Sequence, residues 1–135
     1  MITIVLTENN ADVTVTVVNE CEQLPPPQLG SITIIKNAIP DDAQDFAFTT
    51  TGSGLSNFSL DDDADATLSN QVTFDDLAAG PYSVTESATA GWDLTSINCS
   101  AGGTGDATTG TASITIVGSE NVTCTFVNEE EDQVG

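Results

Sequence analysis

The chain has 135 residues, of which 21 are acidic and only Lys36 is basic, so its formal net charge is −20, and it contains no histidine. This charge repels nucleic acids and anionic membrane surfaces, and no apolar run is long enough to cross a bilayer, so we expect neither a nucleic-acid partner nor membrane insertion. Because the commonest general base is missing and no carboxylate pair marks a cleft, we do not expect an enzyme.

The composition predicts an all-β protein with one domain. Thr, Val and Ile alternate along the chain, with Gly and Asp between the alternating runs, as in strands separated by turns. We divide the chain into an N-terminal hairpin appendage (1–20), a Pro-rich linker (21–30), a β-sandwich domain (31–129) and an acidic tail (130–135).

The appendage repeats the end of the domain. Residues 2–5 match residues 114–117, and residues 13–20 match residues 122–129. An isolated hairpin is marginal in water, so this one must find a sheet elsewhere. The prolines at 25–27 keep the linker extended, which favours pairing with the sheet edge of a neighbouring subunit. The alternative is that the appendage is the tail of a preceding repeat.

Within the domain the turn signals separate eight short strands, as expected for an Ig-like β-sandwich. A Gly-rich loop is expected over residues 100–110. The expected strands cover residues 31–37, 44–51, 56–60, 67–74, 81–88, 93–100, 107–117 and 121–128.

Three polar residues fall on the inward faces of these strands. Because side chains alternate along a strand, Lys36, Glu86 and Asn128 share their faces with apolar neighbours. The neighbours are Ile32 and Ile34 for Lys36, Tyr82 and Val84 for Glu86, and Val122, Cys124 and Phe126 for Asn128. Buried polar groups are costly unless paired, so we expect the three residues to meet inside the sandwich.

The trio has the chemistry of a covalent cross-link. A desolvated Lys36 favours its neutral, nucleophilic amine, and a buried Glu86 favours its protonated form, which polarises the Asn128 carboxamide. The product is an amide between Lys36 and Asn128, formed once with loss of ammonia. The alternative is a buried Lys36–Glu86 ion pair that is hydrogen-bonded to Asn128.

The cysteines predict one disulfide. Cys99 and Cys124 both look inward from late strands, so a bridge between them is geometrically reasonable and indicates an oxidising, extracellular compartment. Two reduced, buried thiols are the alternative. Cys21 lies in the linker and is either free or bonded to another chain.

An acidic cluster is a candidate calcium site. Asp61, Asp63 and Asp65 have the alternating spacing that opens many calcium loops. The Gly and Glu of an EF-hand are missing, because Ala66 and Val72 stand in their places. A solvated acidic turn is the alternative.

Three segments resemble one known family. Ile32–Lys36, Leu77–Glu86 and Val122–Asn128 are similar to the first, middle and last strands of collagen-adhesin B-type domains, the prealbumin-like sandwiches of bacterial surface proteins and pilins. The resemblance implies a Lys36–Asn128 isopeptide bond assisted by Glu86, and a cell-surface location.

We therefore expect a structural subunit of an extracellular filament. It would assemble head-to-tail into a homopolymer by donating residues 1–20 to a neighbouring copy, with calcium as a stabiliser and no other cofactor. The alternative is one module of a tandem-repeat surface adhesin or stalk.

Overall fold

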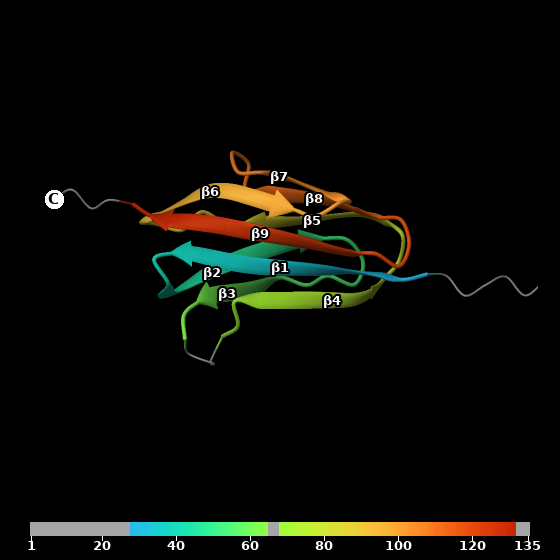
Figure 1. Ribbon diagram of the computed structural model, residues 1–135, viewed down its shortest axis with the longest axis horizontal. Helices are drawn as coiled ribbons and strands as arrows, with labels where there is room; N and C mark the ends of the chain where they lie inside the picture. Colours follow the sequence, from blue (N-terminus) through green and yellow to red (C-terminus); the bar gives the residue numbers. More distant parts are fainter. Residues whose placement is uncertain (1–27, 65–67, 132–135) are drawn as a thin grey trace, which may run out of the picture.

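The computed structural model describes residues 28–64 and 68–131, and every regular element in these ranges is a β-strand. The strands form two sheets that pack as a sandwich (Figure 1). The all-β sandwich expected from the sequence is therefore confirmed. The expected N-terminal hairpin lies outside the described residues.

One sheet has four strands and the other has five. The four-stranded sheet contains, in spatial order, β4 (Gln71–Leu77), β1 (Gly30–Ile39), β9 (Asn121–Glu130) and β6 (Trp92–Cys99). The five-stranded sheet contains β3 (Phe58–Asp62), β2 (Asp42–Thr51), β5 (Gly80–Glu86), β8 (Thr111–Ile116) and β7 (Gly103–Asp106).

The first and last strands lie side by side in the middle of the four-stranded sheet. β1 and β9 are parallel, with Ser31 opposite Asn121 and Ile39 opposite Glu129, whereas the other paired strands are antiparallel. The chain enters β1 at one end of the sandwich and leaves β9 at the opposite end (Figure 1). A force that pulls the start of β1 and the end of β9 apart would therefore slide β1 along β9.

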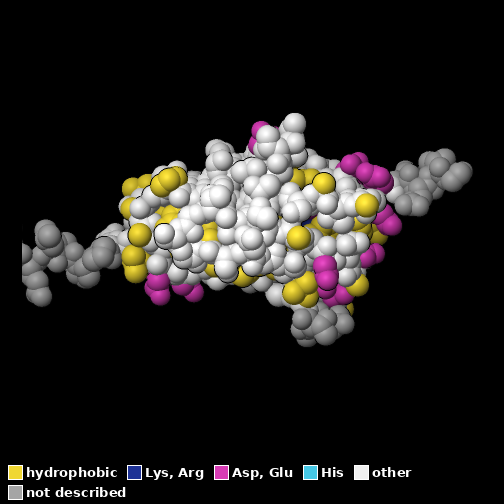
Figure 2. Space-filling view, turned by 180° about the vertical axis from the view of Figure 1, so that it is seen from behind, with side chains coloured by type: hydrophobic (Ala, Val, Ile, Leu, Met, Phe, Trp, Pro, Cys, Tyr) yellow, Lys and Arg dark blue, Asp and Glu magenta, His cyan; other side chains and the backbone are white. Residues whose placement is uncertain are grey.

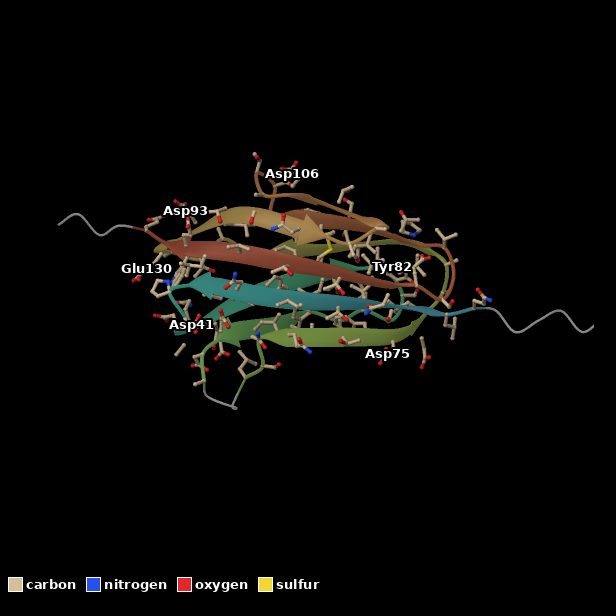
Figure 3. All side chains as sticks on the ribbon, viewed as in Figure 1. Asp41, Asp75, Tyr82, Asp93, Asp106 and Glu130 are labelled. Carbon is tan, nitrogen blue, oxygen red and sulfur yellow. A yellow bond between two sulfur atoms is a disulfide. The ribbon has the colours of Figure 1, made fainter. Side chains whose placement is uncertain are left out.

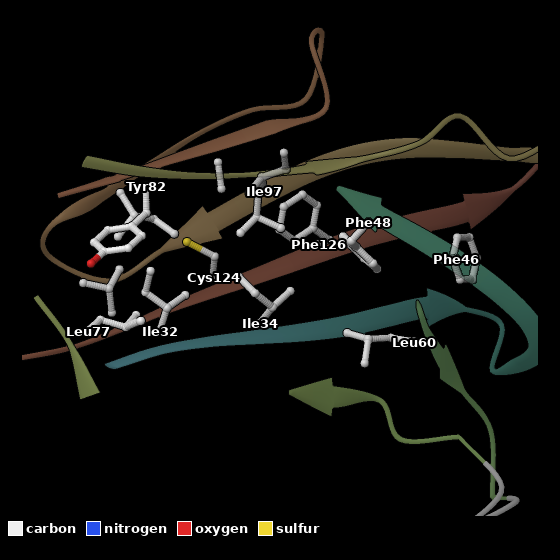
Figure 4. Close-up of a cluster of buried hydrophobic side chains, with 14 of the residues drawn as sticks. Ile32, Ile34, Phe46, Phe48, Leu60, Leu77, Tyr82, Ile97, Cys124 and Phe126 are labelled. Carbon is white, nitrogen blue, oxygen red and sulfur yellow. The ribbon is translucent and has the colours of Figure 1, made fainter. Parts of the chain in front are cut away.

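The inward faces of both sheets form one apolar core (Figure 4). Along β1 and β9 every second residue is buried, which is the period-2 pattern read from the sequence. Aromatic rings connect the layers: Phe48 of β2 packs edge-on against Phe126 of β9, with 5.2 Å between ring centroids. Inside this core the pattern also buries Lys36, Glu86 and Asn128.

One strand was missed by the sequence analysis. The region predicted as a Gly-rich loop and a single strand over 107–117 is a hairpin, in which β7 pairs with β8. β7 lies so close to β6 that a Cβ on Gly105 would be 2.5 Å from Ile97, and one on Gly103 would be 2.8 Å from Cys99. The glycines therefore allow β7 to pack closely against β6. Because β7 contains no apolar residue, hydrophobic alternation could not predict it as a strand.

Among residues 28–64 and 68–131, no helix could cross a membrane. Acidic side chains lie at both ends of the sandwich, as Figure 2 shows from behind. Asp41, Asp93 and Glu130 lie toward the end at which β9 leaves the domain (Figure 3).

A candidate cross-link site between the first and last strands

Lys36, Glu86 and Asn128 meet inside the sandwich. Lys36 Nζ donates a hydrogen bond to Asn128 Oδ1, and Asn128 Nδ2 donates one to Glu86 Oε1 at 2.7 Å. Glu86 Oε2 lies 4.0 Å from Lys36 Nζ. The residues come from β1, β5 and β9, so the site spans both sheets, and the carboxamide lies between the amine and the carboxyl group.

The site is almost sealed from solvent. The relative exposure is 1% for Lys36, 2% for Asn128 and 7% for Glu86. Lys36 Nζ also donates to the Phe126 carbonyl at 3.0 Å and lies 4.4 Å from the centre of the Phe46 ring. An ammonium group would be satisfied by these contacts, yet the apolar surroundings penalise its charge.

Burial moves the protonation of both ionisable groups toward neutrality. Desolvation lowers the pKa of Lys36 to about 8, although the negative charges of Glu86 and Asp62 oppose this shift. Desolvation likewise raises the pKa of Glu86, against the opposing effects of the Lys36 charge and the Asn128 hydrogen bond. Both shifts lower the cost of moving a proton from Lys36 to Glu86, compared with the same pair in water, and so favour a neutral amine beside a carboxylic acid.

A pocket of about 350 Å³ reaches the site from the surface. It lies between the β5–β6 connection, the start of β6 and the β7–β8 turn, and its walls include Glu86 and Asn128. Gly110 closes this turn over the site with a φ of +73°, and its carbonyl accepts a hydrogen bond from the Glu86 backbone N–H at 2.9 Å. A Cβ at Gly110 would be 3.0 Å from the Glu86 carbonyl oxygen, so a side chain would crowd the contact.

The disulfide expected from the sequence is present. Cys99 of β6 and Cys124 of β9 are direct cross-strand partners and are joined by a disulfide. Cys124 is fully buried on the same face of β9 as Asn128. β9 is thus bonded to β6 at Cys124 and contacts the Lys36 amine of β1 at Asn128. Cys21 lies outside the described residues.

The structure describes only part of the acidic cluster. Asp61 lies on β3 and is only 4% exposed, and Asp63 follows β3 and is half-buried, whereas Asp65 is outside the described ranges. Asp62 Oδ2 accepts a hydrogen bond from the Ala38 backbone N–H at 2.9 Å, which ties β3 to β1 near Lys36. In the part of the chain that the structure describes, no three Asp, Glu, Cys or His side chains are grouped to hold a metal ion.

Three contributors to the site were not found from the sequence. Phe46 covers the Lys36 amine, Trp92 packs edge-on against Phe46 at 5.4 Å between ring centroids, and the Asp62 charge acts on Lys36. Phe46 and Asp62 come from the opposite sheet. Alternation along a strand shows which of its side chains point inward, but not which residues of the opposite sheet they meet. Of these three residues, only Trp92 stands out in the sequence, because it is the single Trp and lies between a glycine turn and an apolar strand.

Residues 32–130 match the family described as a prealbumin-like fold domain. The match covers most of the chain, so the protein belongs to this family. Its fold is that of the domains to which the three strand segments are similar in sequence. No curated protein matches the chain.

The solved structures that resemble the chain include a bacterial adhesin from Mobiluncus mulieris, described as containing intramolecular disulfide, isopeptide and ester bond cross-links. The TM-score is 0.63 at 18% identity, covering 93% of this chain and 53% of the adhesin chain. The pilus-presented adhesin Spy0125 (Cpa) gives a TM-score of 0.50 at 18% identity, covering 82% of this chain and 29% of that one. The chain thus spans about half the length of the Mobiluncus adhesin chain, and at these identities the likeness establishes the fold.

Proposed function

We propose that this protein is a structural module of a bacterial cell-surface pilus or adhesin, whose first and last strands are joined by an amide bond between Lys36 and Asn128. The arrangement of an amine, a carboxamide and a carboxyl group in the core carries this proposal. Glu86 acts once as proton shuttle, and no turnover follows. The likeness to surface adhesins supports the same reading.

The chemistry is a condensation. The neutral Lys36 amine attacks the Asn128 carboxamide carbon, and Glu86, which lies beside the carboxamide nitrogen, acts as the general acid. Glu86 gives its proton to the leaving nitrogen and then takes one from the former lysine nitrogen, which restores the carboxylic acid. One C–N bond forms, one C–N bond breaks, and ammonia is released.

The bond would give the module mechanical strength. Tension enters at the start of β1 and leaves at the end of β9, and these strands are parallel neighbours. With the amide in place, the load passes along residues 30–36, across the bond and out through residues 128–130. Residues 37–127 then carry no load and stay folded.

Assembly is proposed to run head-to-tail. The hairpin of residues 1–20 would add to an open sheet edge of a neighbouring copy, and such a heterologous contact repeats into a filament unless it closes into a ring. One observation favours the alternative of a tandem-repeat adhesin or stalk: the described chain enters and leaves at opposite ends of the domain, as serial modules require. Calcium is proposed as a stabiliser of the contacts because the net charge of −20 makes copies repel one another.

Intact-mass measurement of the reduced, denatured protein tests the cross-link. The wild-type chain should weigh one ammonia less than its sequence, and Glu86→Ala should have the full sequence mass. Glu131→Ala, at an exposed position after β9, is the matched control and should show the ammonia loss. A wild-type chain of full mass would reduce the trio to a buried ion pair with a hydrogen-bonded asparagine.

A further inference from the structure

The pocket beside the cross-link site reaches only one side of the reacting groups. Within the described part of the chain, Glu86 and Asn128 line the pocket and Lys36 does not. The amine is covered by the Phe46 ring and the Phe126 carbonyl instead. The nucleophile, Lys36, is therefore enclosed in the core. Asn128, which carries the leaving nitrogen, and Glu86, which passes protons to it, border the pocket.

We propose that this pocket is the exit port for the ammonia that the condensation releases, an inference that rests on the proposed cross-link. Asn128 Nδ2 is the leaving nitrogen and already donates to Glu86 Oε1. When the bond from this nitrogen to the carboxamide carbon breaks, Glu86 supplies its proton, and ammonia departs into the pocket rather than through the packed core. It takes up a further proton from water outside.

A closed site would hold the product against the bond just formed. Groups held in place inside a protein act on each other at effective concentrations far above those in free solution. Trapped ammonia would therefore attack the new amide and return the free amine and carboxamide. Loss to solvent through a pocket of about 350 Å³, much larger than one ammonia molecule, makes the condensation one-way.

The charge around the pocket favours release as ammonium. Asp93 lines the pocket, and Glu129 and Glu130 of β9 stand opposite Asp93 and Trp92 of β6 in the strand register. Figure 3 shows Asp93 and Glu130 near the end of the sandwich at which β9 leaves. A negative rim stabilises a cation, so it favours protonation of the ammonia once it reaches water at the mouth of the pocket.

The test is to plug the port and follow both folding and ammonia loss. Ala88→Phe in the β5–β6 connection and Thr109→Phe in the β7–β8 turn each place a ring at an exposed residue that lines the pocket. Thr104→Phe, on the exposed face of β7 and away from the pocket, is the matched control. Each full chain is refolded from urea, and Trp92 fluorescence measures the folding rate. Quenching of Trp92 by acrylamide measures whether the pocket is closed. Intact mass measures the loss of ammonia.

In the plugged variants, we expect Trp92 to be shielded from acrylamide and to report wild-type folding rates, while ammonia loss slows by about tenfold or more, as when product release limits a reaction. Thr104→Phe should match the wild type in all three measurements. Wild-type rates of ammonia loss in a shielded variant would overturn the exit port and leave the cross-link standing. A wild-type chain that never loses ammonia would overturn both, since no product would need to leave.

Discussion

Lys36 and Asn128 are offset by two residues in a parallel strand pair. Lys36 stands opposite Phe126 and Asn128 opposite Ala38, and the lysine side chain reaches forward along the strands to the carboxamide. Both residues lie near the carboxyl ends of their strands. A bond between them would therefore act near the point at which β9 leaves the domain, and would prevent β1 and β9 from sliding apart.

The mechanical consequence can be measured by pulling single molecules from the two ends of the domain under reducing conditions. The cross-linked wild type should not unfold, because residues 37–127 lie outside the load path. Asn128→Ala should lengthen by about 300 Å on unfolding, at roughly 3.4 Å per extended residue. Asn121→Ala, an exposed asparagine on the same strand, should behave as wild type. Equal lengthening in all three proteins would exclude a covalent bond between the strands.

The rate of bond formation should depend on pH with a bell shape. The reaction needs one proton on the Lys36–Glu86 pair, placed on the carboxyl group. Above the Lys36 pKa of about 8 the pair loses this proton and Glu86 no longer acts as an acid. Below the raised pKa of Glu86 both groups are protonated, and the ammonium has no lone pair with which to attack. Ammonia loss after refolding at a series of pH values measures the profile, and a rate that rises steadily with pH would leave Glu86 without a role as the acid.

The two-residue period of a strand decides which features of the site could be predicted from the sequence. Alternation along one strand places Lys36 with Ile32 and Ile34, so the buried face of each member of the trio was predictable. Alternation does not show how the two sheets stack, so the meeting of Glu86 with Lys36 and Asn128 was expected from the cost of burying unpaired polar groups, and the resemblance to a known family implied the same trio. Phe46 and the pocket at the β7–β8 turn follow from the stacking alone, so they were visible only in the structure.

The disulfide should stabilise the fold on its own. It closes a loop with a sequence separation of 25, and restricting such a loop in the unfolded chain contributes about 3 kcal/mol. Reduction should lower the free energy of unfolding in urea by this amount. The Cys99→Ala, Cys124→Ala double variant should be equally weakened and insensitive to reductant. If reductant leaves the wild-type midpoint unchanged while both thiols become alkylated, the loop-closure account is wrong.

Divalent cations should stabilise the protein more than a monovalent salt of equal ionic strength does. The net charge of −20 on a chain of 135 residues creates repulsion that bound cations relieve, and Asp41, Asp93 and Glu130 lie toward the same end of the sandwich. Calcium should raise the melting temperature, or promote assembly, more than sodium chloride at equal ionic strength, and a chelator should reverse the effect. Identical melting curves in both salts would mean that only general screening acts.

Assembly should depend on residues 1–20. Residues 13–20 repeat the sequence pattern of residues 122–129, so as a strand this segment would present Val13, Val15 and Val17 on one face, which would need a partner sheet. Removing residues 1–20 should leave a folded monomer that retains the ammonia loss and the disulfide but no longer polymerises. Sedimentation and electron microscopy of both chains provide the measurement, with Val15→Asp in the full chain as a milder variant that should weaken polymerisation. Fibres from the truncated chain would reject the donor hairpin, and a full chain that stays monomeric would favour the repeat-module alternative.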